Sequence, residues 1–253
     1  MPLRIKAALT HLLVSFLIVS TVLILVILVW YPGNYFGAAG VSKILFVFAL
    51  VDVCAGPLIT LIIYNPFKRS LKMDLGCIAL LQFVALVYGV NAIYSGRPVY
   101  LVFNVDMFTI VSATDIADSE LKKSKIKYLP RTGPVVVGAR LPLNSNESRD
   151  ILFSALNGGA DLPQLPRYYL PYESLAVDVK KKMLEFDALK KRIPEAKSND
   201  ANLKINAALK NARLKIADVG FIPIRGKIQD MTMMVRRSDS AIVEMLAIDP
   251  WGN

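Results

Sequence analysis

Three long apolar runs set the first hundred residues apart from the rest of the chain. Residues 7–30 and 75–94 contain no formal charge, and only Asp52 and Pro57 interrupt the run 44–64. A helix of roughly 20 apolar residues crosses the hydrocarbon of a bilayer. The pattern therefore predicts three transmembrane helices over these ranges, and the first run is too long for the core of a cleaved signal peptide.

Beyond residue 96 the pattern becomes that of a water-facing domain. Apolar residues alternate after Pro98 as in a half-buried strand, whereas those between Leu175 and Ile193 recur at helical spacing. Pro223 predicts that its strand lies at a sheet edge. The predicted strands are 98–110, 221–228 and a hairpin of 231–237 with 241–248, and the predicted helices are 150–156, 175–193 and 202–214. We therefore expect a three-helix membrane region over 1–96 and an α+β domain over 97–253.

Charge follows the same division without indicating a nucleic-acid partner. The 253 residues carry 30 Lys and Arg against 20 Asp and Glu, a net charge of +10. Seven basic and two acidic residues precede Pro98, and 23 basic and 18 acidic residues follow it. Neither half has the concentrated basicity of a dedicated nucleic-acid-binding protein.

The basic residues beside the apolar runs predict an orientation. Arg4 and Lys6 share one side of the membrane with the cluster Lys68, Arg69 and Lys72, whereas the other side has only Lys43 and Arg97 close to the bilayer. Positive residues accumulate on the cytoplasmic side of inner-membrane proteins. We therefore expect a cytoplasmic N-terminus and a C-terminal domain in the periplasm.

Asp52 is the residue whose position demands a physical explanation. An ionised carboxylate inside a bilayer costs several kcal/mol unless it is paired, protonated or turned into a helix bundle. Gly56 and Pro57 follow one turn later, where the proline weakens the helix. We expect Asp52 to lie near the level of Ser20 and about a turn beyond Gln82, with His11 closer to the cytoplasm. Such a polar seam is structural glue, a proton or ion path, or a docking groove for another membrane helix.

The candidate chemistry is limited by residue types. The domain contains no His and no Cys, which removes most general-base, thiol and zinc-binding arrangements, so we predict no enzyme, no metal site and no cofactor. Both cysteines, Cys54 and Cys77, fall in the apolar runs, where we expect them to be packing residues.

Two segments of the domain have open alternatives. The lysine run Lys122, Lys123, Lys125 and Lys127 either contacts acidic lipid headgroups or is a solvated loop. The proline-rich segment 158–172 carries Tyr168, Tyr169 and Tyr172. Tyrosines on a stiff loop bind partners at low entropic cost, so this segment is either a periplasmic interaction surface or a loop packed on its own domain.

Several short motifs, taken in order, resemble one family of membrane proteins. The first is Arg4-x-Lys6-Ala7 with His11-Leu12 and Ser15, followed by Trp30-Tyr31-Pro32 with Tyr35-Phe36. Later motifs are Val51-Asp52-Val53, Gly56-Pro57-Leu58-Ile59-Thr60-Leu61, Asp74-Leu75, Gln82, Ala85-Leu86, Tyr88-Gly89, Arg97-Pro98-Val99-Tyr100 and Val102-Phe103. Their order and spacing over the first hundred residues are similar to those of the TfpX/TfpZ family of type IV pilin accessory proteins.

This resemblance implies a non-catalytic inner-membrane protein that acts beside the major pilin in the assembly or surface display of type IV pili. It implies pilin or the pilus assembly machinery as partner, and it provides no catalytic residues. A binding role for Asp52, Gly56 and Pro57 is our hypothesis. The alternatives are a membrane sensor, which would need more cytoplasmic sequence for its output, and a small ion- or proton-coupled transport component that uses Asp52.

Overall fold

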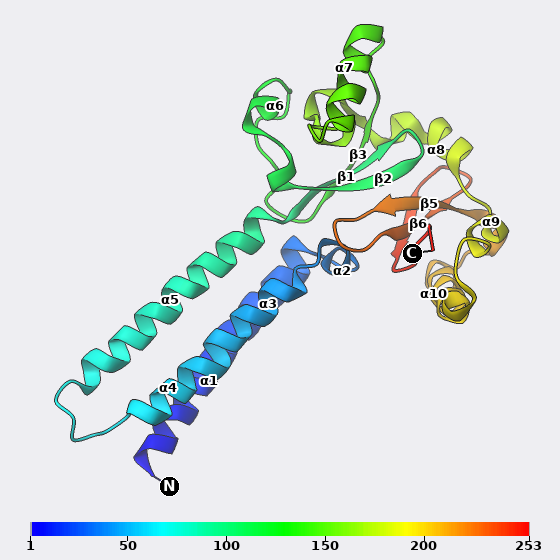
Figure 1. Ribbon diagram of the computed structural model, residues 1–253. Helices are drawn as coiled ribbons and strands as arrows, with labels where there is room; N and C mark the ends of the chain where they lie inside the picture. Colours follow the sequence, from blue (N-terminus) through cyan, green and yellow to red (C-terminus); the bar gives the residue numbers. More distant parts are fainter. Residues whose placement is uncertain (1, 253) are drawn as a thin grey trace. The chain divides into compact units, whose positions relative to one another are not determined.

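The computed structural model describes residues 2–252 of the chain, shown as a ribbon in Figure 1. The chain forms two compact units, one of Met1–Phe36 with Val41–Gly96 and the other of Gly37–Gly40 with Arg97–Asn253. The short segment Gly37–Gly40 joins the second unit because the Ala38 carbonyl accepts hydrogen bonds from the backbone N–H groups of Lys227 and Ile228, both at 3.1 Å.

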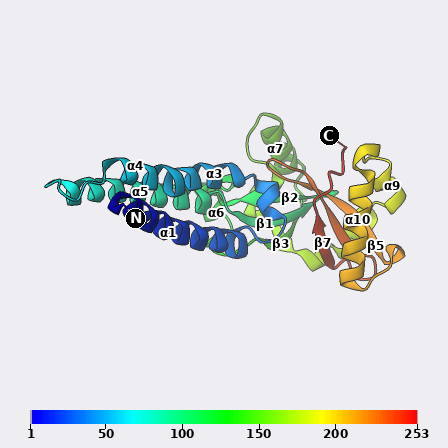
Figure 2. The ribbon, with the colours of Figure 1, turned by 90° about the horizontal axis from the view of Figure 1, so that it is seen from below.

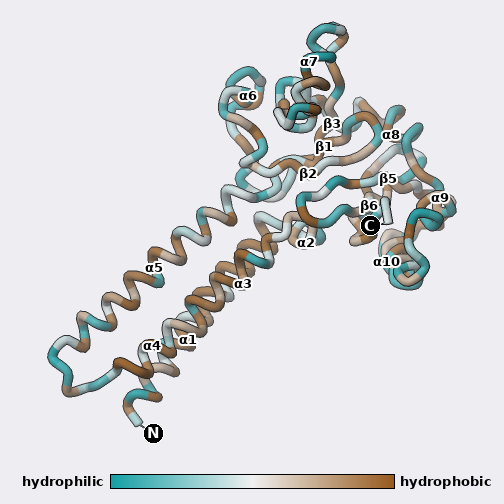
Figure 3. Tube along the Cα trace, in the orientation of Figure 1, coloured by the Kyte–Doolittle hydropathy of each residue, from teal (hydrophilic) through white to brown (hydrophobic). Residues whose placement is uncertain are grey.

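Three apolar helices make up the first unit. They span Leu3–Trp30, Ser42–Ile63 and Leu71–Ser95, and each is long and apolar enough to cross a membrane. Figure 3 shows these helices as predominantly hydrophobic, with more polar positions along α5 than along α1 and α3. The membrane part of the predicted fold class is therefore confirmed. The regular α-helical parts are α1 (Leu3–Leu25), α3 (Ser42–Ala49), α4 (Gly56–Ile63) and α5 (Leu71–Ser95), and the short α2 (Tyr35–Ala39) precedes α3.

The outer faces of these helices suit lipid rather than water. Leu28, Phe46, Ile62 and Tyr88 are each at least two-thirds exposed. Leaving such a side chain in water costs about 1.5–3 kcal/mol relative to burying it, so a soluble unit would cover it. Cys54 and Cys77 are also exposed on this surface, which corrects the expectation that they are packing residues.

The second helix contains an irregular turn at Asp52. Leu50–Ala55 is π-helical, and the N–H of Gly56 bonds to the carbonyl of Val51, five residues earlier. Pro57 has no N–H to donate, so the regular bonding pattern fails at this turn. A π-helical turn inside an α-helix often accompanies a functional site. The end of the first helix, Val26–Trp30, is also π-helical.

A seven-stranded mixed sheet organises the second unit. Its order is β4-β3-β1-β2-β5-β6-β7, with parallel pairing of β1 to β3 and of β2 to β5 and antiparallel pairing elsewhere. The strands are β1 (Pro98–Asn104), β2 (Met107–Ser112), β3 (Val135–Ala139), β4 (Tyr169–Pro171), β5 (Val219–Arg225), β6 (Met231–Arg236) and β7 (Ile242–Leu246). The predicted α+β domain is confirmed, including the β6–β7 hairpin.

Helices pack against the sheet around two apolar clusters. One cluster joins β1, β2 and β3 to α7 (Ser145–Leu156) through residues such as Val102 and Ile151. The other joins β5, β6 and β7 to α9 (Phe186–Lys190) and α10 (Glu195–Ala212) through residues such as Ile205 and Phe221. Figure 2 shows α9 and α10 near β5 and β7. The remaining helices are α6 (Asp118–Lys122) and α8 (Ala176–Lys182).

Two predicted elements are each divided in the structure. The strand predicted over 98–110 is the hairpin of β1 and β2, which turns at Val105 and Asp106. The helix predicted over 175–193 is interrupted between α8 and α9, because Leu184 and Phe221 exchange backbone hydrogen bonds of 2.7 and 3.0 Å in a β-bridge. An extended residue at 184 cannot belong to a continuous helix.

Two further elements, each beside a proline, differ from the prediction. Pro194 begins α10 at Glu195, seven residues before the predicted start at Asn202, because proline is tolerated at a helix N-terminus. Pro223 lies in β5 between β2 and β6 rather than at a sheet edge. The β2–β5 ladder consists only of the pairs at Ile224 and Arg225, so it begins after the proline.

Candidate functional site

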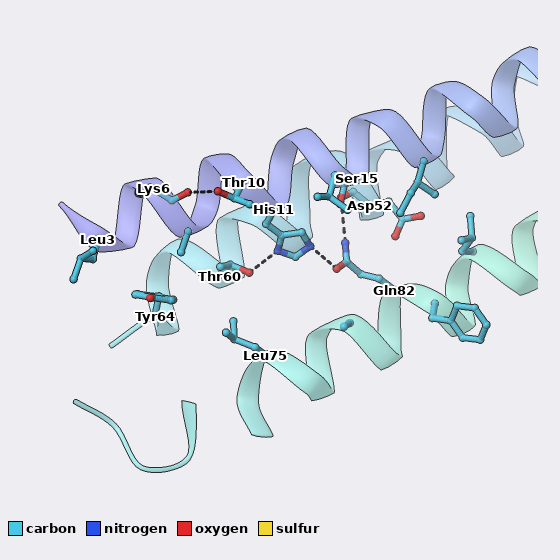
Figure 4. A pocket seen from close by; sticks show the side chains of 16 residues that line it. Leu3, Lys6, Thr10, His11, Ser15, Asp52, Thr60, Tyr64, Leu75 and Gln82 are labelled. Atoms are coloured by element: carbon cyan, nitrogen blue, oxygen red, sulfur yellow. Dashed lines mark hydrogen bonds between the residues drawn. The ribbon is translucent and has the colours of Figure 1, made fainter. Parts of the chain in front are cut away.

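A groove of about 650 Å³ lies among the three helices of the first unit, close to the π-helical turn. Figure 4 shows α1, α4 and α5 around it. Its lining is mostly apolar, but several hydrogen-bonding side chains follow one side. The lining residues are Leu3, Lys6, Ala7, Thr10, His11, Val14, Ser15, Ile18, Asp52, Thr60, Tyr64, Leu75, Ala79, Gln82, Phe83 and Leu86.

His11 connects the three helices through hydrogen bonds. Its Nδ1 lies 2.7 Å from Thr60 Oγ1, and its Nε2 lies 2.8 Å from Gln82 Oε1. Figure 4 shows the imidazole between these partners. Because Gln82 Oε1 only accepts, Nε2 carries the proton, and the Nδ1 of a neutral ring accepts from the Thr60 hydroxyl. The network therefore fixes one tautomer of His11.

Gln82 continues this network to the backbone at Asp52. Its Nε2 donates to the Asp52 carbonyl oxygen at 3.1 Å. This contact between the Gln82 amide and the Asp52 carbonyl requires glycine at position 56, because a Cβ there would lie 2.1 Å from Gln82 Nε2 and 2.6 Å from Gln82 Cδ. Gly56 and the adjacent Pro57 are both buried. Gly56 thus provides the space in which the amide of Gln82 reaches the π-helical turn.

The carboxylate of Asp52 differs from the other polar groups of the groove. The residue is only 5% exposed, and among residues 2–252 neither carboxylate oxygen has a hydrogen-bond partner. Ser15, also buried, lines the same part of the groove. A charged residue at the centre of a bilayer helix costs about 2.5–3.5 kcal/mol. Asp52 therefore has hydrogen-bonding capacity that the described residues do not use.

Of the five intramembrane residues singled out from sequence, the structure brings together His11, Gln82, Asp52 and Gly56. Pro57 is buried next to Gly56 but does not line the groove. Ser15 rather than Ser20 lines the groove with Asp52, so the expected position of Asp52 along the first helix was wrong. Sequence reasoning also missed Thr60. Helical spacing could have identified it, because Thr60 follows Gly56 by four residues and so lies on the same face of the helix. Ser15 follows His11 by the same interval on the first helix.

The tyrosines of the proline-rich loop face into their own domain. Tyr172 is buried, and its hydroxyl donates to the Ser240 carbonyl at 2.8 Å. The Tyr169 hydroxyl donates to a backbone carbonyl at 2.5 Å, its ring lies 5.0 Å from that of Tyr100, and the Tyr168 hydroxyl donates to Glu147. Burial raises the pKa of Tyr169 and of Tyr172. These contacts favour the packing alternative, because each of the three hydroxyl groups is already hydrogen-bonded within the domain.

Comparison with known proteins gives the chain a family. Residues 1–40 match the family model described as "Fimbrial assembly protein FimB". A fimbrial assembly protein of serogroup E1 from Dichelobacter nodosus is 29% identical over 94% of this chain and 93% of its own length. The protein of serogroups C1 and C2 from the same organism is 38% identical over 45% of this chain and 88% of its own length. No solved structure matches the chain. The chain belongs to the family of fimbrial assembly proteins.

Proposed function

We propose that this protein is a non-catalytic accessory factor of type IV pilus assembly that binds the transmembrane helix of a pilin in its intramembrane groove. Membership of the fimbrial assembly family supports a role in pilus biogenesis. The accessory role, the pilin partner and the relation to the TfpX/TfpZ family rest on the resemblance of the first hundred residues.

The observation that carries the proposal is the buried, unpartnered carboxylate of Asp52 beside an apolar groove. A partner helix that places a hydrogen-bond donor against this carboxylate would lower the cost of its burial. Hydrogen bonds between membrane helices contribute about 0.6 kcal/mol on average and up to about 1.7 kcal/mol. Apolar contacts along the groove would add to that energy through close packing.

The surrounding network supports a binding role because it holds the groove in one shape. His11, Gln82 and Thr60 are already paired with one another, so they link the helices rather than offer free groups. Asp52 alone among these four has side-chain oxygens without a partner in the described chain. A preorganised groove with one unmet polar group is suited to selecting one register of an incoming helix.

The proposed orientation has the N-terminus in the cytoplasm, the helices in the inner membrane and the domain in the periplasm. It rests on the basic residues at the helix ends, with Lys68 and Arg69 between the second and third helices, Lys72 in the first turn of the third, and Arg4 and Lys6 at the start of the first. In this orientation the groove would meet a pilin helix while that helix is still in the inner membrane.

Site-specific photocrosslinking in native membranes tests the proposal. A photoreactive amino acid replaces Val14, which lines the groove, or Phe16, which is 57% exposed but outside it. Residues two positions apart in an α-helix lie about 200° apart around its axis, so the two probes sample opposite faces of the first helix. We expect a pilin adduct, identified by mass spectrometry, from position 14 and not from position 16. Equal adducts from both positions, or none from Val14 in piliated cells, would contradict the groove as the pilin site.

A further inference from the structure

The segment 121–129, which comprises the end of α6 and the loop that follows it, has an inner face anchored in the domain and an outer face of cations. Leu121, Ile126 and Leu129 pack on the apolar cluster of β1 and β2. Ser124 Oγ lies 2.9 Å from the Leu121 carbonyl and 3.0 Å from both the N–H and the carbonyl of Ile126, which ties the turn together. The backbone is therefore held in one conformation.

The outer face of this loop, hereafter the lysine loop, consists of Lys122, Lys123, Lys125, Lys127 and Tyr128. All five side chains are exposed, and Tyr128 is 85% exposed. Only Lys123 has a carboxylate within ion-pair distance in the described part of the chain, Glu120 at 2.6 Å. Among the described residues, the other three lysines form no ion pair, and their loop is tied by the hydrogen bonds of Ser124.

A buried arginine ties the lysine loop to the place where the chain leaves the third apolar helix. Arg97 is 5% exposed, and its Nε and Nη2 donate to the carbonyl oxygen of Pro130 at 3.1 and 2.8 Å. Arg97 follows Ser95, the last residue of the third span, by two residues. Two residues of chain reach at most about 7 Å. Covalent connection therefore keeps the base of the loop near the membrane surface.

We propose that the lysine loop binds the phosphates of anionic lipid headgroups at the surface from which α5 emerges. The headgroup layer is roughly 5–7 Å thick, and charges attract across about 8–10 Å at physiological salt. Cations within that range of a bilayer surface are drawn to acidic lipids, and an exposed tyrosine suits the interface between headgroups and hydrocarbon. The short covalent link favours lipid over an acidic protein, because the headgroups are present wherever the loop is.

Amine labelling of the full-length protein in lipid nanodiscs tests the inference. One preparation contains phosphatidylcholine alone, and the other contains added phosphatidylglycerol. Both leaflets have the same lipid composition, so the result does not depend on the orientation of the protein. The discs contain no pilin, so the result does not depend on pilin binding either. We expect sulfosuccinimidyl acetate to modify Lys122, Lys125 and Lys127 up to about fivefold more slowly in the anionic discs at low salt, and high salt to remove the difference.

Exposed lysines elsewhere in the domain provide the control. Lys191 follows α9 and Lys210 lies on α10, the two helices that contribute to the other apolar cluster. Their labelling should be the same in the two lipid mixtures. Equal labelling of the lysine loop in both mixtures would overturn the proposal, as would equal slowing at the control lysines. Protection that arises in phosphatidylcholine discs only after pilin is added would assign the loop to an acidic protein and would also overturn it.

Discussion

Replacing Gly56 with alanine perturbs the hydrogen-bond network of the groove at one point. The added Cβ would lie 2.1 Å from the side-chain nitrogen of Gln82. The amide is the end of a flexible side chain, so it can move away without distorting the helices. Once moved, it can no longer donate to the Asp52 carbonyl or accept from His11. The energetic cost therefore comes from the lost hydrogen bonds rather than from steric strain.

The expected change in the free energy of unfolding combines two opposing effects. Glycine to alanine in a helix is worth about 0.5–1 kcal/mol of added stability. Two hydrogen bonds between membrane helices contribute about 1–3 kcal/mol together. Gly76 on α5 provides a matched control, because no atom lies within 4 Å of a Cβ placed there. Since helix propensity cancels between the two variants, Gly56→Ala should be less stable than Gly76→Ala by about 1–3 kcal/mol.

Unfolding of the purified protein by sodium dodecyl sulfate in mixed micelles measures this difference. Repeating both substitutions in a Gln82→Ala background isolates the cause, because the shortened side chain no longer meets the new methyl group. In that background the two variants should have the same stability. Equal stability of Gly56→Ala and Gly76→Ala in the otherwise unchanged protein would refute the reasoning, as would a gap that persists without Gln82.

Three further predictions concern the domain and the orientation of the chain. Gly226→Ala places a Cβ 2.0 Å from a backbone carbonyl oxygen that cannot rotate away, so thermal denaturation should show the domain destabilised by about 1–3 kcal/mol. Tyr172→Phe removes the hydrogen bond to the Ser240 carbonyl and should cost about 1 kcal/mol, whereas Tyr128→Phe on the exposed loop should leave denaturation unchanged. Alkaline phosphatase fused after Asn253 should be active, and an inactive fusion alongside an active cytoplasmic reporter at the same point would show that the proposed orientation is wrong.

The three helices were predictable because the bilayer imposes a strong local rule. About 20 residues without charge are needed to cross hydrocarbon, and that property is visible in any window of the sequence. Asp52 and Gln82 were identified for the same reason, since polar side chains in such a run are rare. Ser15 and Thr60 occur in the motifs that carry the family resemblance but were not identified as site residues, because a small hydroxyl side chain can hydrogen-bond to its own helix and is common there.

Features of the domain that depend on distant residues were not predictable. The helix expected over 175–193 has the correct apolar spacing, but the bridge from Leu184 to Phe221 joins residues far apart in the sequence. A local periodicity contains no information about that pairing. Likewise, the composition of the tyrosine loop suits either binding or packing, and the buried contact between Tyr172 and Ser240 is what favours packing.

A pair of substitutions at Asp52 tests the central claim most directly, with surface pilus counts and the pilin adduct from position 14 as readouts. Asp52→Asn keeps the shape and an accepting oxygen, whereas Asp52→Leu leaves a partner's donor unsatisfied inside the bilayer. The account predicts that the asparagine variant retains most piliation and crosslinking, and that the leucine variant reaches the membrane at a normal level but loses both. If asparagine is as inactive as leucine, Asp52 acts by ionising, as a proton-coupled component would require. A leucine variant that matches the unmodified protein in piliation and in pilin crosslinking would contradict the proposed binding groove.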